Sequence, residues 1–216
     1  MQYVRCISGV MQVGDQTGAP ARTWQVLLLG GPSGTGKTAV SYRLAKHYGV
    51  GITEVDDFHA LLEWMATSEQ LSAISPWKTN AAFEQLSAAE ILTHLLEVGR
   101  TMASGLDAVI GNRLEAQVPV VLEGDFIDPS LAAQASFSGH RNDRRVRAVF
   151  LYEPDEEQLL NNYLLREPER GPQTKRAKVS WLHGQWLKRE AERLGLPVIA
   201  ARPWETVLER TIAAAS

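Results

Sequence analysis

The feature that most constrains the fold of this chain is a glycine-rich octapeptide, GPSGTGKT, at residues 31–38. It follows the apolar run VLLL at 26–29 and precedes a segment with Val40, Leu44 and Tyr48 at helical spacing. A strand that enters a helix through such a turn aims several backbone N–H groups and the positive end of the helix dipole at one point. The octapeptide therefore predicts an anion site between a strand and a helix.

Spacing of the type G-x-x-x-x-G-K-[ST] suits the phosphate chain of a nucleotide. Glycines allow the tight turn, because they tolerate backbone angles that other residues avoid. We expect the Lys37 ammonium to reach the β- and γ-phosphates and the Thr38 hydroxyl to bind Mg²⁺. The predicted nucleotide-binding residues are Gly31, Pro32, Ser33, Gly34, Thr35, Gly36, Lys37 and Thr38.

Five short apolar runs alternate with helical patterns along the chain, which is typical of βαβ units and a parallel sheet covered on both faces. The fold class predicted is therefore a three-layer α/β sandwich. The expected strands are Val26–Leu29, Gly51–Val55, Val118–Leu122, Val146–Leu151 and Leu196–Ala200. The expected helices are Lys37–Tyr48, a long one from Ser87 toward Gln117 broken near Gly99 or Gly105, Asp155–Arg166, Thr174–Leu194, and a last one starting at Pro203.

Length and composition limit the class of protein. With 216 residues, 44% of them hydrophobic, the chain is expected to form one domain over 1–216, with residues 1–23 as an N-terminal extension. Its net charge of −3 argues against a nucleic-acid binder. The single cysteine, Cys6, excludes an internal disulfide. No apolar run approaches the roughly 18 residues of a membrane span, and no secretory leader is visible, so we expect a cytoplasmic protein.

Acidic residues follow two of the predicted strands. Asp56 and Asp57 come directly after residues 51–55, and Glu123 follows residues 118–122. A carboxylate that accepts the proton of a hydroxyl makes that hydroxyl a better nucleophile. We interpret Asp56 as such a base, with Asp57 as the alternative; a helix N-cap is the competing role for either side chain. Glu123 is expected to hold Mg²⁺ or position a substrate, unless it merely pairs with a nearby cation.

At this point the chain resembles the P-loop small-molecule kinases, which include nucleoside, gluconate and phosphoribulose kinases. The segment VDDFH at 55–59 is similar to the acidic motif that supplies their catalytic base. The segment VVLEGDFIDP at 120–129 looks most like 2-phosphoglycerate-kinase-type proteins. The resemblance implies a P-loop NTPase fold of kinase type with strand order 2-3-1-4-5 and ligands at the carboxyl ends of the strands. It also implies that Arg202, in ARPW at 201–204, lies near the adenine of ATP.

Three further groups of residues are candidates for the site. Residues 166–178, rich in Arg, Pro and Gly, are a candidate lid, whose Arg166 and Arg170 would neutralise charge on the transferred phosphoryl group. Asp57, His59, Glu123 and Asp125 are candidate substrate contacts, although a histidine in the position of His59 is more often a packing residue. Trp64 and Trp77 are more consistent with core aromatic residues than with substrate contacts.

The predicted acceptor-binding region, residues 58–118, holds three Lys or Arg residues and seven Asp or Glu residues. A site for a phosphorylated acid usually gathers Arg and Lys. The acidic balance therefore favours a neutral or cationic acceptor, such as a polyol or an antibiotic-like compound. The leading hypothesis is an ATP-dependent kinase that phosphorylates a hydroxyl group of a small molecule. The alternative is a nucleotide-dependent binding module or switch with slow ATP hydrolysis.

Overall fold

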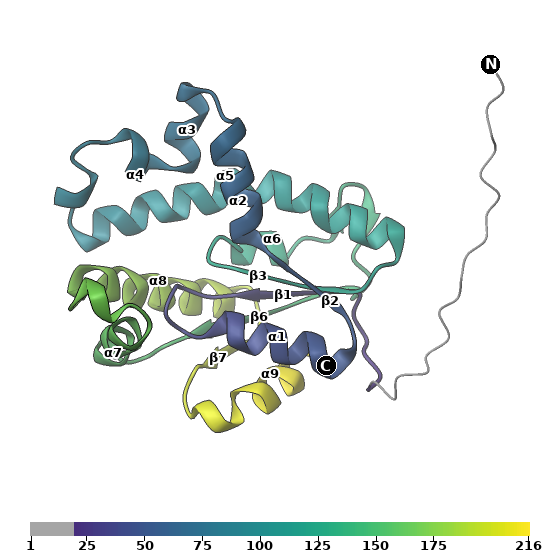
Figure 1. Ribbon diagram of the computed structural model, residues 1–216. Coiled ribbons are helices and arrows are strands. Elements are labelled where there is room, and N and C mark those ends of the chain that lie inside the picture. Colours follow the sequence, from purple (N-terminus) through teal and green to yellow (C-terminus); the bar gives the residue numbers. More distant parts are fainter. Residues whose placement is uncertain (1–19) are drawn as a thin grey trace, which may run out of the picture.

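A five-stranded parallel sheet forms the centre of the protein, in a computed structural model that describes residues 20–216 (Figure 1). The order β2-β3-β1-β6-β7 is the predicted 2-3-1-4-5 arrangement, which is thereby confirmed. Most of the expected N-terminal extension, together with Cys6, lies outside the described residues. The strands of the sheet are β1 Val26–Gly30, β2 Gly51–Glu54, β3 Val120–Gly124, β6 Val146–Tyr152 and β7 Val198–Ala200. A separate two-stranded hairpin, β4 Ser136–Phe137 and β5 His140–Arg141, was not predicted.

Helices cover both faces of the sheet and build a lobe above its edge (Figure 1). On one face lie α1 and α9, and on the other lie α5, α6 and α8. The α-helices are α1 Lys37–Tyr48, α2 Val55–Met65, α3 Ser68–Ile74, α4 Pro76–Thr79, α5 Ala88–Ala116, α6 Pro129–Ala132, α7 Glu156–Arg166, α8 Thr174–Arg193 and α9 Val207–Ala215. Three short 3₁₀ helices are η1 Phe83–Gln85, η2 Pro168–Arg170 and η3 Trp204–Thr206.

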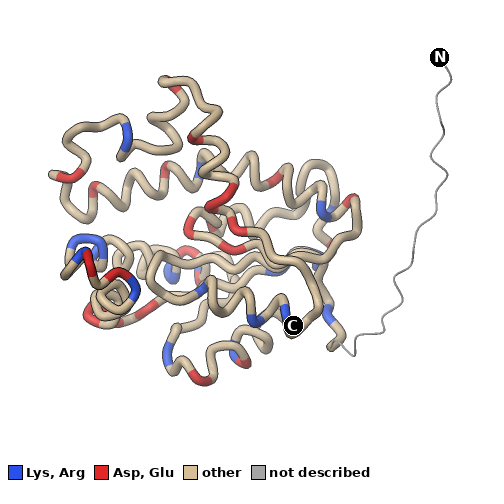
Figure 2. The backbone as a smooth tube through the Cα atoms, viewed as in Figure 1, with Lys and Arg blue, Asp and Glu red and all other residues tan. Residues whose placement is uncertain are grey.

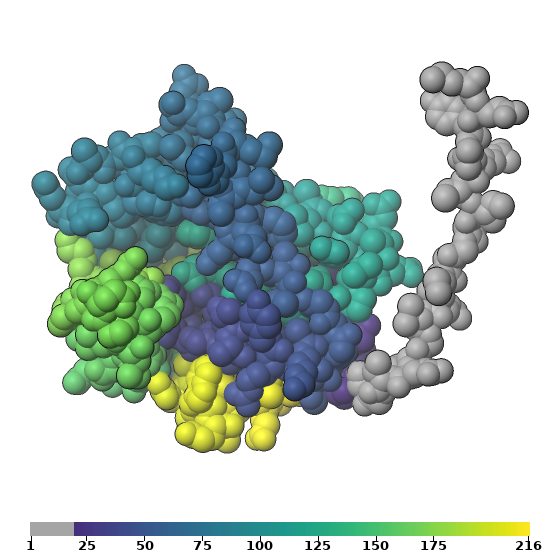
Figure 3. Space-filling view, viewed as in Figure 1, coloured from purple at the N-terminus to yellow at the C-terminus, as the bar shows by residue number. Residues whose placement is uncertain are grey.

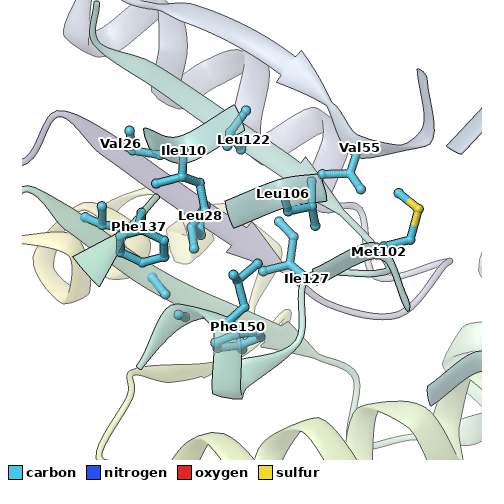
Figure 4. Packing of buried hydrophobic residues seen from close by; sticks show 14 of the residues in the cluster. Val26, Leu28, Val55, Met102, Leu106, Ile110, Leu122, Ile127, Phe137 and Phe150 are labelled. Atoms are coloured by element: carbon cyan, nitrogen blue, oxygen red, sulfur yellow. The ribbon is translucent and has the colours of Figure 1, made fainter. Parts of the chain in front are cut away.

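The alternation of side chains along the strands divides the core into two clusters. In β1, Val26 and Leu28 pack toward α5 and α8, whereas Leu27 and Leu29 pack toward α1 and α9. Figure 4 shows the first cluster, where Leu28 and Ile110 meet between strand and helix. Because both faces of β1 are buried, its sequence is apolar throughout instead of alternating with polar residues. Burial of both faces thus explains the continuous apolar run VLLL from which the strand was predicted.

Helix α5 corrects one prediction, since it runs unbroken through Gly99 and Gly105. Its buried side chains recur every three or four residues on both sides of these glycines, at Val98, Met102 and Leu106. Packing of this stripe against the sheet holds the backbone helical where the intrinsic preference of glycine is weak. The capping box predicted at its start is present, because the Ser87 and Glu90 side chains bind each other's backbone N–H groups.

Other boundaries also differ from prediction. Strand β2 ends at Glu54, so Asp56 and Asp57 lie in the first turn of α2 and neither is its N-cap. Pro203 precedes the 3₁₀ helix η3, and α9 begins only at Val207. The interpretation of Trp64 as a core aromatic residue is wrong, because it is 90% exposed. Among the described helices, none is long and apolar enough for a membrane crossing.

The topology brings distant segments to one edge of the sheet. Because the strands are parallel, their carboxyl ends meet, and the turn after β1 lies beside the acidic ends of β2 and β3. Figure 2 shows acidic segments gathered at this edge. Ligands of open α/β sheets bind at this edge.

Candidate active site

The turn after β1 is shaped by its glycines and held by side chains from other elements. Gly36 has φ 80°, and a Cβ there would lie 2.5 Å from the ring of Trp204. The Thr35 hydroxyl donates to the carbonyl of Pro32 at 2.9 Å, and the Asn162 amide of α7 donates to the carbonyl of Gly34 at 2.8 Å. The left-handed backbone and the close ring leave only glycine able to occupy position 36. The turn is thus preorganised, with α1 beginning immediately after it.

Lys37 is buried at the start of α1, and its ammonium forms an ion pair with Asp125, just beyond β3. Burial alone would lower the pKa of Lys37, but the carboxylates of Asp125 and Glu123 outweigh this effect and raise that pKa above its ordinary value. The lysine is therefore charged at neutral pH. Its contact with Asp125 holds the ammonium near the glycine-rich turn, where a phosphate oxygen could replace the carboxylate.

Thr38 and Glu123 form a pair that fits a magnesium ion. The Thr38 hydroxyl donates to Oε1 of Glu123 at 2.8 Å, while Oε2 of Glu123 is buried without a hydrogen-bond partner among the described residues. Burial raises the pKa of this carboxyl group, against the opposing effect of Lys37. No cluster of three or more His, Cys, Asp or Glu side chains suited to a metal occurs in residues 20–216. Mg²⁺ does not need one, since it commonly binds one or two protein oxygens together with phosphates and waters.

Asp56 and Asp57 are adjacent in α2 but differ in placement. Asp56 and Asp125 line a cleft of about 1000 Å³, whereas Asp57 does not line it. Asp56 is exposed, but desolvation by the surrounding protein, reinforced by the negative charge of Asp125, raises its pKa above the usual value, although Lys37 acts in the opposite direction. Asp56 therefore has the position and the raised basicity of a proton acceptor.

A cleft of about 1000 Å³ opens between the lobe formed by α2–α5 and the segment that links α7 to α8. Figure 3 shows its two walls, the blue lobe above and the green segment below. Ser33 of the glycine-rich turn and Asp56 both line it. A cavity of this size accommodates a small organic molecule.

The wall contributed by the lobe is largely aromatic. His59 lies between Trp77 and Phe126, with ring centroids 5.4 and 5.0 Å away. Its Nε2 lies 2.6 Å from the carbonyl oxygen of Ile74, so the ring is fixed by packing and hydrogen bonding. Trp77 is partly buried against the core and also lines the cleft. His59 is thus a wall residue whose Nε2 is engaged by the carbonyl of Ile74.

The predicted lid is shorter than expected, because α8 already begins at Thr174. Glu167 gathers three arginines around its carboxylate: Arg166 at 2.7 Å, Arg176 at 2.9 Å and Arg170 at 3.2 Å. Hydrogen bonds from Arg166, together with the charges of Arg176 and Arg166, lower the pKa of Glu167. Arg170 and Arg176 line the cleft, but Arg166 does not. The structure therefore brings Arg170, and not Arg166, to the candidate site.

A smaller cavity of about 200 Å³ lies on the other side of the glycine-rich turn and contains Arg202. Nε of Arg202 is 3.6 Å from Oε2 of the buried Glu153, and its guanidinium also donates to the Asn162 side chain at 3.3 Å. Burial raises the pKa of Glu153. Trp204 forms part of the same cavity wall. The sequence segment expected near adenine thus lines a cavity next to Gly34 and Gly36.

Sequence reasoning missed His183, Glu167 and Glu153. His183 lies on α8, lines the cleft and is buried, which lowers its pKa to about 4. Its position within an ordinary amphipathic helix carries no signal in the sequence. Glu167 lies among the lid arginines, so the charge alternation there could have indicated it as their partner. Glu153 directly follows β6, and Glu123 lies near the carboxyl end of β3. The strand-end argument that identified Glu123 could therefore also have identified Glu153.

Comparison with known proteins supports the fold. No family model matches the chain, and no curated protein matches it. A sugar kinase from a Janibacter species has a similar structure, with TM-score 0.52 and 19% sequence identity, over 88% of this chain and 94% of that chain. A gluconokinase from Sinorhizobium meliloti (TM-score 0.47, 17% identity, 90% and 93% covered) is also similar. So is a shikimate kinase from Acinetobacter baumannii, in complex with shikimate (0.48, 18%, 89% and 94%). The chain shares an α/β fold with the sugar kinase.

Proposed function

We propose that this protein is an ATP-dependent phosphotransferase that phosphorylates a hydroxyl group of a small molecule. One observation carries the proposal: the glycine-rich turn, through Ser33, and the carboxylate of Asp56 line the same cleft. The turn would hold the triphosphate, and Asp56 would meet the acceptor hydroxyl. The similarity of fold to a sugar kinase supports this reaction class by analogy alone.

In the proposed reaction, the acceptor oxygen forms a bond to the γ-phosphorus while the bond from that phosphorus to the β–γ bridging oxygen breaks. The acceptor proton passes to the carboxylate of Asp56, and ADP leaves with the electrons of the broken bond. Lys37 leaves Asp125 and binds phosphate oxygens, and Arg170 neutralises charge on the transferred group. Thr38 and Glu123 would hold Mg²⁺, which supplies further charge neutralisation.

The nucleotide base would occupy the smaller cavity beside Arg202 and Trp204. The glycine-rich turn lines both this cavity and the cleft, through different residues. A nucleotide lying across the turn would therefore place its base on one side and its γ-phosphate on the other.

The wall of the cleft favours a neutral or cationic acceptor with an apolar or flat portion. Trp77 and Phe126 offer aromatic surface, and Asp56 and Asp125 add negative charge. Among the described lining residues, the lobe contributes no lysine or arginine to the cleft, and Arg170, Lys175 and Arg176 all lie on the opposite wall. A phosphorylated acid would lack free cations from the lobe.

The test is an assay of ADP formation with Mg·ATP against matched acceptors. Polyols, nucleosides, aminoglycosides and amphipathic hydroxyl compounds form one group, and sugar acids and 2-phosphoglycerate form the other. We expect stimulation, and transfer of one phosphoryl group detected by mass spectrometry, within the neutral and cationic group. Strong turnover of only the acidic group would refute the acceptor class, and ATP binding without transfer to any acceptor would favour the switch hypothesis.

A further inference from the structure

A second large cavity, of about 670 Å³, lies at the opposite edge of the sheet, where β6 begins. It is bounded by the turn at residues 142–145 and by the loop at 194–197 that leads into β7. None of its lining residues lines the active-site cleft or the smaller cavity beside Arg202. This cavity is therefore separate from the proposed reaction.

Arg147 of β6 is one of the residues that line this cavity. It is partly buried, and its Nε is fully buried without a hydrogen-bond partner in residues 20–216. Within that range, no carboxylate forms an ion pair with Arg147. Arg147 as a whole is only partly buried, so an anion in the cavity could pair with the charge of its guanidinium.

The turn beside Arg147 presents more positive charge. Asp143 and Arg144 have φ 41° and 64°, and Arg145 N–H donates to the carbonyl of Asn142 at 2.6 Å, which closes the turn. The left-handed backbone is unfavourable for a residue such as Arg. The side chain of Asn142 offsets part of this cost by accepting from the N–H of Val146 at 2.8 Å. The fold thus holds Arg144 at the cavity in a strained conformation.

The charge of the lining is positive overall. Arg141, Arg144 and Arg147 line the cavity, and Asp143 is the sole carboxylate among the described lining residues, 3.5 Å from Nε of Arg141. Arginine pairs with phosphate and carboxylate through two parallel hydrogen bonds. Because the volume exceeds that of a single inorganic ion and falls within the range of small-molecule sites, the cavity suits an organic anion with two or more charges.

We propose that this cavity is a second ligand site, which binds a small polyanion carrying phosphate or carboxylate groups through Arg147 and Arg144. The site does not depend on the proposed kinase activity, because it shares no residue with the cleft. Helix α8 runs from the cleft, which its residues Thr174 and His183 line, to this cavity at Leu194. The ligand would therefore lie against the end of a helix that also forms the active-site wall.

The test is isothermal titration with two probes, inorganic pyrophosphate and citrate, which distinguish phosphate from carboxylate chemistry. The Lys37→Ala variant is titrated beside the wild type, so that binding at the glycine-rich turn is separated from binding at the cavity. We expect at least one probe to bind the Lys37→Ala protein, and Arg147→Gln in that background to weaken this binding about tenfold or more. The matched control is Arg43→Gln, on the exposed surface of α1, which should leave the affinity unchanged.

Arg144→Gly keeps the proposal testable if the Arg147 variant fails to fold. Glycine tolerates the left-handed backbone, so this variant should raise the melting temperature while it weakens binding of the same probe severalfold. The proposal would be overturned if neither probe bound the Lys37→Ala protein. It would also be overturned if the Arg147→Gln and Arg144→Gly variants bound the probe with the same affinity as the Lys37→Ala parent.

Discussion

At the scale of single residues, the ion pair of Lys37 with Asp125 links the proposed nucleotide site to the proposed acceptor site. Asp125 lies beside the lysine and also contributes to the charge that raises the pKa of Asp56. When a phosphate replaces Asp125 as the partner of Lys37, the negative charge around Asp56 increases. Nucleotide binding would therefore strengthen Asp56 as a base at the moment when the acceptor must lose its proton.

The first prediction concerns Lys37. In Lys37→Ala, we expect the turnover rate to fall by about 10²–10³-fold, because one preorganised cation facing the transferred phosphate is lost. Initial rates of ADP formation at saturating ATP measure this change. Arg43→Gln serves as the control, since it removes a positive charge from the exposed part of the same helix. An unchanged rate in Lys37→Ala would contradict the proposed role.

The second prediction separates Asp56 from Asp57. Asp56→Asn should lower the transfer rate by about 10²-fold or more, while the affinity for Mg·ATP stays nearly unchanged, because a general base contributes about 10²–10⁴-fold. Asp57→Asn is the matched control, with a small effect, since that side chain does not line the cleft. If both variants lose ATP binding together, these residues are structural.

The third prediction follows from the raised pKa of Asp56. A base acts in its ionised form, so kcat/KM should rise with pH along an acidic limb whose midpoint lies above the ordinary Asp value of about 3.9. The carboxyl group of Asp56 binds its proton more tightly in the folded state than in the unfolded chain. The free energy of unfolding should therefore fall as pH rises from the ordinary to the raised pKa. Asp56→Asn removes both effects, which pH–rate profiles and urea unfolding at several pH values measure.

At the scale of elements, helix α5 shows how packing overrides local preference. Gly105 is exposed in the middle of this helix, and a Cβ there would meet no atom within 4 Å. Gly111 is buried in the same helix, and its Cβ would lie 2.6 Å from that of Ser138 in the β4–β5 turn. The two glycines therefore have different reasons to be present, although both lie within one continuous helix.

The fourth prediction uses this pair. Gly105→Ala should raise the free energy of unfolding by up to about 1 kcal/mol, because alanine has the higher helix propensity and finds open space. Gly111→Ala should lower it, since the added methyl group collides with the hairpin. Urea denaturation of both variants measures the difference. Equal effects would mean that the helix does not pack against the hairpin as described.

At the scale of the whole molecule, the cleft lies between two parts of the chain that bound ligands would hold together further. One wall belongs to the lobe of α2–α5 and the other to α8 and residues 167–173. Few cross-wall hydrogen bonds are present, the Lys175 contact with the carbonyl of Glu84 being one of them. Ligands that touch both walls would stabilise them against each other.

The fifth prediction is that Mg·ATP raises the melting temperature of the wild type. At a concentration of about 100 times Kd, the folded state gains about 2.7 kcal/mol. A productive acceptor added with Mg·ADP should raise it further, and hydrogen exchange should slow in both walls. Lys37→Ala serves as the comparison, with a much smaller shift. A shift of equal size in that variant would place the nucleotide elsewhere.

The sequence by itself determined the expected strands, the glycine-rich turn and the acids at the strand ends, because these depend on local patterns such as apolar runs and spacing. The strand order 2-3-1-4-5 came from the resemblance to the P-loop small-molecule kinases. Only the tertiary structure decided that Arg170 and Arg176 line the cleft while Arg166 turns to Glu167, that Asp56 and not Asp57 faces the cleft, and that Trp64 is exposed. These outcomes depend on contacts between residues far apart along the chain. Which side chains line the cleft and which are exposed depends on how each helix is rotated against its neighbours and on the partners of each side chain. A short segment of sequence does not determine either.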